Sequence, residues 1–122
     1  MLATSDGIRP GLEGRLERVV EGDLITKHVG GKGIFATPAM IGLMEWASHK
    51  SLQGLLPEGE TTVGYEVHVR HLAPAKPGST VVVTSKLTEV KGNKLYFDVA
   101  SHQGDKLLGS GTHKRAIVPS EL

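Results

Sequence analysis

The clearest change of pattern along the chain occurs at Thr37, where irregular sequence gives way to a run of helix-forming residues. Thr is a good helix-capping residue, and Pro38 suits a first helical position. The segment that follows is rich in Leu, Met, Ala and Ile. Gly54 can close a last turn, and Pro57 forbids continuation. The pattern predicts one helix of about four turns that begins at Pro38 and ends near Gln53 or Gly54.

The segments around this helix have the composition of β-strands, because they are rich in Val, Thr and Tyr. We expect strands at Leu12 to Val20, Thr61 to Leu72, Ser79 to Val90, Lys94 to His102 and Lys106 to Val118. Their separators, such as Lys76-Pro77-Gly78, are short enough for the four later strands to be sequential antiparallel neighbours. An apolar helix followed by such a meander is best satisfied by a sheet that curls around the helix. The expected fold is α+β, in the order strand, helix and four strands, over one domain from residue 1 to 122.

Residues 21–36 show no hydrophobic period, and Gly30-Gly31-Lys32-Gly33 makes a regular element there improbable. The spacing differs from that of a Walker-type phosphate loop, which is longer and ends in Gly-Lys-Ser/Thr. We expect a loop here that covers a site.

Charge and composition then exclude several functions. Fourteen basic and thirteen acidic residues leave no excess charge for a nucleic acid or an anionic membrane. The chain has no cysteine, which removes disulfides and thiolate chemistry and fits an intracellular protein. Residues 1–10 lack a signal-peptide pattern, and no apolar run approaches the roughly 20 residues that span a bilayer. We expect a cytoplasmic protein, and its small size favours an oligomer.

His71 is the first candidate for chemistry. From Val63 to His71, period-two alternation places Val63, Tyr65, Val67, Val69 and His71 on one face, with Gly64, Glu66, His68 and Arg70 on the other. The first face is the expected buried one, so His71 should face the helix, where it can act as an acid, base or electrophile. A satisfied histidine at a strand end is the alternative.

Two helix residues are further candidates. Glu45 lies in an otherwise apolar stretch, where a charge is costly unless it is paired, although a solvated Glu fits the helical wheel equally well. Thr37 is expected to cap the helix, and the same geometry places its hydroxyl beside amides that can stabilise an oxyanion.

The remaining histidines give weaker signals. His68 and His71 are three residues apart in a strand, so their rings point to opposite faces, and we reject them as a metal pair. Glu45 and His49 have helical i, i+4 spacing, which suits a shared metal, but a surface contact is the commoner reason for such a pair. His113 and Arg115 share a face of the last strand, where Arg115 can anchor a phosphate or carboxylate, although solvated edge charges are the commoner explanation.

Five segments together resemble the hot-dog-fold thioesterases related to fluoroacetyl-CoA thioesterase. They are Ala36-Thr-Pro-Ala-Met40, Leu43-Met-Glu-Trp-Ala47, Gly59-Glu-Thr-Thr-Val-Gly64, Val69-Arg-His-Leu-Ala73 and Gly111-Thr-His-Lys-Arg115. The resemblance implies a hot-dog fold, a homodimer with a continuous sheet and the potential to form a dimer of dimers. It also implies acyl-CoA substrates near the subunit interface, with no cofactor beyond the coenzyme A of the substrate. The family's Thr, Glu and His recur at Thr37, Glu45 and His71.

The same resemblance implies that Gly64 and Arg115 lie near the acyl group. The covering loop departs from the fluoroacetyl-specific pattern, because it reads His28-Val-Gly-Gly-Lys-Gly33 and Phe35 is its only aromatic residue. We therefore expect Phe35 near the substrate and a more open pocket for another short or medium acyl group.

These residues suggest hydrolysis of an acyl thioester. Glu45 would activate water or attack directly, Thr37 would orient the carboxylate or the nucleophile, and His71 would polarise the carbonyl or transfer protons. The alternative is a non-catalytic module that binds acyl-CoA as a sensor or carrier. A hydratase on the same fold would resemble an Asp/His arrangement that we do not find in the sequence.

Overall fold

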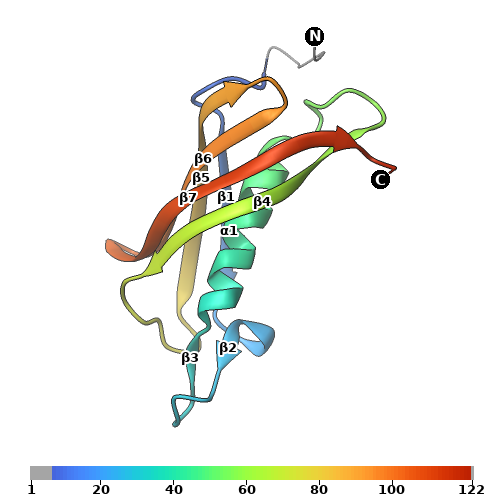
Figure 1. Cartoon of the computed structure of the whole chain (residues 1–122). Coiled ribbons are helices and arrows are strands. Elements are labelled where there is room, and N and C mark those ends of the chain that lie inside the picture. The colour runs from blue at the N-terminus through green and yellow to red at the C-terminus, as the bar shows by residue number, and fades with distance from the viewer. Residues whose placement is uncertain (1–6, 122) are drawn as a thin grey trace.

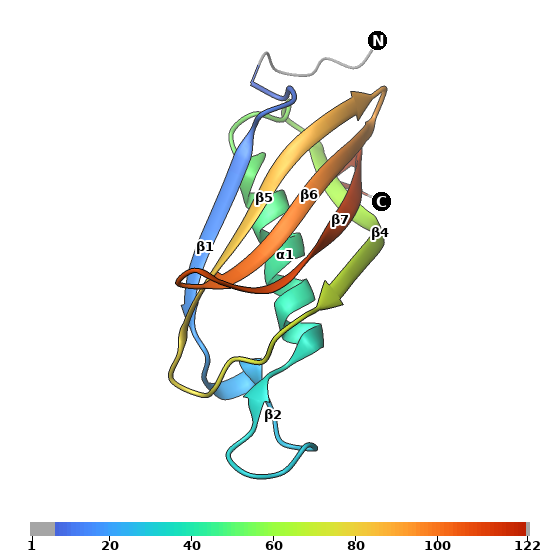
Figure 2. The same ribbon diagram turned by 90° about the vertical axis from the view of Figure 1, so that its left-hand side faces the viewer.

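One helix lies against one face of a five-stranded antiparallel sheet (Figures 1 and 2). This computed structural model describes residues 7–121. The elements in chain order are β1 (Glu13–Val19), the 3₁₀ turn η1 (Gly22–Leu24), β2 (Ile25–Thr26), β3 (Ile34–Phe35), α1 (Thr37–Ser51), β4 (Glu60–His71), β5 (Thr80–Lys91), β6 (Lys94–Gln103) and β7 (Lys106–Pro119). The α+β prediction is confirmed, and the main elements differ from their expected bounds by three residues or fewer.

The order of strands in the sheet is β1-β5-β6-β7-β4, so the expected meander is wrong at one connection. β4 pairs with β7 and not with β5, its neighbour in sequence. The connection between them, residues 72–79, is eight residues long and reaches about 26 Å when extended, whereas three strand spacings are about 14 Å. The chain can therefore cross the end of the sheet, which leaves β4 as an edge strand.

The core forms between α1 and the facing side of the sheet. Helix residues Met40, Met44 and Ala47 are fully or almost fully buried at helical spacing. They pack in one cluster with alternating residues of the sheet, which include Val81, Val83, Leu87, Leu95, Phe97, Val99 and Leu108. Each large side chain buried in this way contributes about 1.5–3 kcal/mol relative to exposure. This layer fixes the position of α1 and therefore of the candidate residues on it.

The segment expected to be a loop, residues 21–36, contains a short 3₁₀ turn and a small two-stranded sheet. Ile25 pairs with Phe35, and Thr26 pairs with Ile34. The loop between β2 and β3 projects beyond the end of the main sheet near the start of α1 (Figure 1). Gly30 and Gly31 have positive φ angles there, which side-chain-bearing residues rarely adopt. The glycine run thus shapes a turn beside the helix start.

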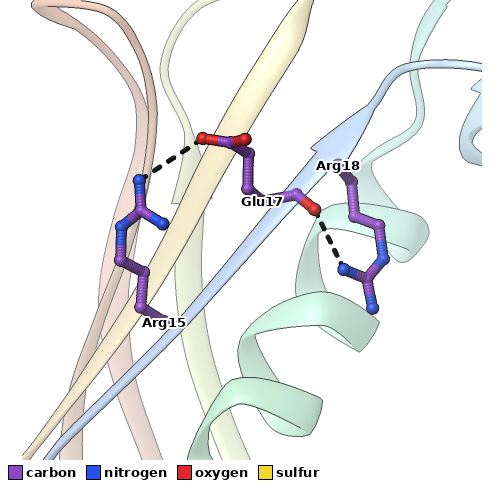
Figure 3. A network of polar contacts seen from close by, with 3 residues as sticks. All are labelled: Arg15, Glu17 and Arg18. Atoms are coloured by element: carbon purple, nitrogen blue, oxygen red, sulfur yellow. Dashed lines mark hydrogen bonds and ion pairs between the residues drawn. The ribbon is translucent and has the colours of Figure 1, made fainter.

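The two edges of the sheet differ in character. On β1, Arg15 Nη2 lies 3.4 Å from Glu17 Oε1, and Arg18 Nη1 donates a hydrogen bond to the Glu17 carbonyl (Figure 3). Charged side chains of this kind protect an edge from pairing with another chain. On β4 the exposed residues include Val63 and Tyr65. The stretch of β4 from Val63 to Tyr65 carries no charge, whereas His68 and Arg70 are exposed further along the same strand.

Candidate active site

Thr37 is the first residue of α1 and lies against His71 at the end of β4. Its Oγ1 is 2.8 Å from His71 Nδ1, a hydrogen bond between residues 34 positions apart. The prediction that Thr37 caps the helix is wrong, because Ala36 occupies the cap position and no side chain bonds the cap. The Ala36 amide donates to Leu24 and its carbonyl accepts from Met40, so the helix begins one residue early. The Thr37 hydroxyl is thereby free to contact the imidazole.

His71 faces the helix, as strand alternation predicts. Burial lowers the pKa of its imidazole, and the backbone of Ala73 partly opposes this shift. The ring meets Phe35 edge-on, with centroids 6.0 Å apart, and Phe35 is fully buried. Nε2 is buried and has no hydrogen-bond partner within residues 7–121. The result is a neutral imidazole with one nitrogen engaged by Thr37 and one nitrogen uncommitted.

Two hollows flank Thr37. The larger, about 570 Å³, lies between the β2–β3 hairpin and the helix start, where His28 and Phe35 contribute to its wall. The smaller, about 280 Å³, is lined by Thr37, His71 and the segment from Leu72 to Pro74. Thr37 therefore stands between two spaces that can receive a ligand.

Glu45 lies in a different hollow, two helical turns further along α1. This hollow has a volume of about 340 Å³ and is lined by Gly42, Glu45, Trp46, His49 and Arg115. Glu45 is half-buried there. No direct ion pair joins Glu45 to Arg115 within the described residues. The Glu45 carboxylate is therefore not paired with a cation in a structural salt bridge among the described residues.

Arg115 and His113 are buried on β7, and the explanation that they are solvated edge charges is wrong. Their exposed fractions are 7% and 1%, because β7 is an interior strand and both side chains face the helix side. Arg115 Nε donates to Thr62 Oγ1 at 2.9 Å, Nη2 to the Thr62 carbonyl at 3.0 Å, and Nη1 to His113 Nε2 at 3.2 Å. Every partner is neutral, so the guanidinium carries a buried charge without a contacting carboxylate.

His113 is held as a neutral hydrogen-bond acceptor for Arg115. Its Nδ1 donates to the carbonyl of Glu66 at 2.9 Å, which places the ring proton on Nδ1 and leaves Nε2 to accept. Burial lowers the pKa of His113, the Glu66 carbonyl opposes the shift, and Arg115 adds to it. The neutral ring is therefore the favoured form near neutral pH.

Gly64 reaches this group because of a β-bulge that the sequence pattern did not show. The β4–β7 register shifts between Gly64 and Glu66, so Tyr65 has no partner on β7. The expectation that Val63 and Tyr65 belong to the buried face is wrong, since they are 36% and 47% exposed. A bulge reverses the alternation, which turns Gly64 inward before it and keeps His71 inward after it.

Gly64 also marks the closest approach of three functional groups. A Cβ on this residue would lie 2.8 Å from His113 Cε1, 3.0 Å from Glu45 Oε1 and 3.2 Å from Arg115 Nη1. Only glycine leaves this space open. Gly64, Glu45 and Arg115 therefore meet, as the predicted acyl-binding role of Gly64 and Arg115 requires.

Within one chain, Glu45 lies too far from the Thr37–His71 pair to contact it. Eight helical residues separate Glu45 from Thr37, a rise of about 12 Å. Glu45 contacts β4 at Gly64, and His71 is seven residues further along that strand, or about 20 Å. Side chains of these lengths do not close that distance. The predicted residues thus form two groups within a protomer.

Three site residues escaped the sequence interpretation or were given another role. Thr62 was missed because only the bulge tells which face of β4 it occupies. His113 was weighed as a surface residue and His49 as a possible metal ligand, yet both belong to the Arg115 network.

No group of three potential metal-ligating His, Cys, Asp or Glu residues occurs within the described part of the chain. Within residues 7–121, no helix combines the length and the apolar character needed to cross a bilayer.

Comparisons with known proteins show the family to which the chain belongs. Residues 19–121 match the FlK family, described as fluoroacetyl-CoA-specific thioesterase. The fluoroacetyl-CoA thioesterase of Streptantibioticus cattleyicolor is 43% identical over 88 residues, which span 72% of this chain and 63% of that relative.

Solved structures extend the comparison to the fold. The F36A mutant of FlK, crystallised with fluoroacetate and CoA, is 35% identical, superposes with a TM-score of 0.83 and matches over 93% of this chain and 98% of its own. A hot-dog-like protein from Thermanaerovibrio acidaminovorans is 24% identical, with a TM-score of 0.83 over 92% of this chain and 84% of its own, and it confirms the hot-dog fold. The chain therefore belongs to the FlK family of fluoroacetyl-CoA-specific thioesterases.

Proposed function

We propose that this protein is a thioesterase that hydrolyses a short- or medium-chain acyl-CoA to the free acid and coenzyme A. The observation that carries the proposal is the Thr37–His71 hydrogen bond at the start of α1, in a chain of this family. The fluoroacetyl-CoA thioesterase relative and the FlK complex with fluoroacetate and CoA support an acyl-CoA substrate. No cofactor is required, because coenzyme A is part of the substrate.

The start of α1 supplies groups suited to the carbonyl of a thioester. The amides of a first helical turn have no partner within the helix, and the helix dipole favours negative charge there. Pro38 contributes no N–H, which leaves the amides of Thr37 and Ala39. Donors of this kind stabilise the oxyanion that develops during acyl transfer. The neutral His71 adds a ring that polarises the carbonyl or transfers protons.

Glu45 acts either as the base that activates water or as the nucleophile that attacks the thioester. As a base it takes a proton from water while the water oxygen attacks the carbonyl carbon, the carbon–sulfur bond breaks and the thiolate is protonated. As a nucleophile its carboxylate attacks the carbonyl carbon, the carbon–sulfur bond breaks and the thiolate leaves and is protonated, and water then hydrolyses the resulting anhydride. Both routes need the carboxylate within contact of the thioester that the Thr37–His71 pair holds.

A homodimer would meet this requirement if Glu45 of the partner subunit approached the Thr37–His71 pair. The β4 edge has no partner strand on one side among the described residues and exposes Val63 and Tyr65. Antiparallel pairing of two β4 edges would make one continuous sheet and cover these side chains. Further association into a dimer of dimers, and a location in the cytoplasm, stay predictions from the sequence.

The cover above the Thr37–His71 pair is proposed to admit acyl groups other than fluoroacetyl, whereas the Glu45 hollow receives the acyl chain itself. The β2–β3 loop carries glycines at its tip, and the hollow below it measures about 570 Å³. His28 is held by Thr26, with Nδ1 2.6 Å from Oγ1, and is exposed. Phe35, the one aromatic residue of this segment, lies beneath the hollow and against His71. This cover is more open than an aromatic lid.

Release of free thiol from acyl-CoA esters of two to eight carbons tests the proposal. We expect turnover of at least one ester, and a loss of 10²-fold or more in kcat for Glu45→Gln, as for removal of a catalytic base. Glu58→Gln is the matched control, because Glu58 is exposed and lines none of the hollows that contain Thr37, Glu45 or His71. Saturable binding without thiol release would instead support the acyl-CoA-binding module.

A further inference from the structure

His49 lines the Glu45 hollow one helical turn beyond Glu45, and its hydrogen bonds fix which ring nitrogen carries the proton. Arg115 Nη2 lies 3.4 Å from His49 Nδ1, and a guanidinium can only donate. Thr62 Oγ1 accepts from Arg115 Nε, which leaves its own proton to point at His49 Nδ1, 3.3 Å away. Nδ1 is therefore the acceptor, and the proton belongs on Nε2.

The Nε2–H group has no acceptor among residues 7–121, and His49 is only half-buried. Stacking on Trp46, with centroids 5.5 Å apart and an interplanar angle of 26°, limits rotation of the ring. Burial and the nearby Arg115 lower the pKa of His49, so the ring is neutral near pH 7. The hollow thus contains a fixed and unused hydrogen-bond donor.

The position of this donor relative to Glu45 defines which part of a substrate it meets. The reacting carbonyl carbon must contact the Glu45 carboxylate, and His49 lies a rise of about 6 Å beyond it along α1. A hollow of about 340 Å³ accepts a short acyl group and excludes the much larger coenzyme A moiety. The donor therefore faces the acyl chain near its third or fourth carbon.

We propose that His49 is a specificity-determining residue that selects acyl groups with a hydrogen-bond acceptor, such as a hydroxyl, keto or carboxylate oxygen, at the third or fourth carbon. The proposal rests on the proposed thioesterase function and names the substrate class of that site. An all-hydrocarbon acyl group would leave the Nε2–H without a partner when it displaces water, which is a penalty. An acyl group with an acceptor restores that bond.

The test compares butyryl-CoA with 3-hydroxybutyryl-CoA, two esters with the same number of carbons. We expect the wild type to favour the hydroxylated ester about tenfold in kcat/KM, the scale of one well-placed hydrogen bond. His49→Phe keeps a ring against Trp46 and removes the donor, so the ratio should fall to about one, mainly through the hydroxylated ester. His49→Gln retains a side-chain N–H and should keep a clear preference.

A wild-type ratio near one, or a ratio that His49→Phe leaves unchanged, would overturn the assignment of His49. If neither ester releases thiol, the same comparison is made with dissociation constants, and the thioesterase proposal itself fails only when no ester of two to eight carbons releases thiol. Tighter binding of 3-hydroxybutyryl-CoA that disappears in His49→Phe would then support the role of His49, and equal binding would refute it. Thermal melting of both variants controls for loss of the fold.

Discussion

Adding one methyl group at Gly64 is the most informative small change in the site. The Gly64→Ala Cβ would lie 2.8 Å from His113 Cε1, whereas carbon atoms pack best at about 3.5–4.0 Å. The His113 ring cannot simply rotate away, because its Nδ1 is hydrogen-bonded to the Glu66 carbonyl. The ring is also stacked against Phe97, with ring centroids 6.4 Å apart. The clash must therefore be relieved by a shift of about 1 Å in the ring, in β4, or in both.

The loss of stability follows from the difference between the 2.8 Å contact and the ordinary packing distance. Overpacking of a well-packed interior costs about 1–3 kcal/mol, so the free energy of unfolding should fall by that amount. The same methyl would lie 3.0 Å from Glu45 Oε1 and 3.2 Å from Arg115 Nη1, so it pushes on both groups. A misplacement of about 1 Å can cost about 10²-fold in rate. We expect kcat/KM to fall by about one to two orders of magnitude.

Urea denaturation and steady-state thiol release measure the two effects separately. Gly42→Ala is the control for stability alone, because a Cβ there meets nothing within 4 Å and an exposed helical glycine should gain about 0.5–1 kcal/mol as alanine. Its kcat/KM is not a control, since Gly42 lines the Glu45 hollow. A Gly64→Ala protein with wild-type stability and wild-type kcat/KM would show that Gly64, Glu45 and Arg115 do not converge as described.

Three further predictions concern the hydroxyl–imidazole pair, the buried histidines and the sheet edge. Thr37→Ala should lower kcat about tenfold or more through loss of the bond to His71, while Thr37→Ser, which keeps the hydroxyl, should retain most activity in the same thiol-release assay. Burial lowers the pKa of His113 in the folded protein, so the unfolded chain binds more protons than the folded one as the pH falls. Urea titrations from pH 8 to 5.5 should therefore show a decreasing free energy of unfolding. The decrease should be smaller for His113→Asn. Val63→Lys places a charge on the β4 edge and should shift the protein toward monomer in sedimentation velocity; an unchanged dimer would exclude this edge as the interface.

Local pattern was sufficient for the helix and for the long strands. Met40, Met44 and Ala47 follow helical spacing, and the strand segments alternate over most of their lengths. These local patterns therefore predict which type of element each segment forms and roughly where it begins and ends. Strand order was not predictable in the same way, because a short separator such as Lys76-Pro77-Gly78 constrains only its own turn. The full connection of eight residues is long enough to cross the sheet end.

The site shows the same division between local and non-local information. His71 was placed correctly because it lies after the bulge, where alternation resumes. Val63 and Tyr65 were misplaced because nothing in the residue types indicates the extra residue that opposes β7. The burial of Arg115 depends on β7 being interior, which is a property of the whole sheet. Tertiary pairing, not propensity, decides these positions.

In the proposed dimer, Glu45 of the partner subunit completes the Thr37–His71 pair, and mixed dimers can test this arrangement. Glu45→Gln and His71→Ala proteins, each nearly inactive alone, are mixed in equal amounts, unfolded together and refolded. Random pairing makes half of the dimers mixed, each with one intact site of two, so about a quarter of wild-type thiol release should return. Recovery of no activity, with dimer formation verified, would contradict the shared site.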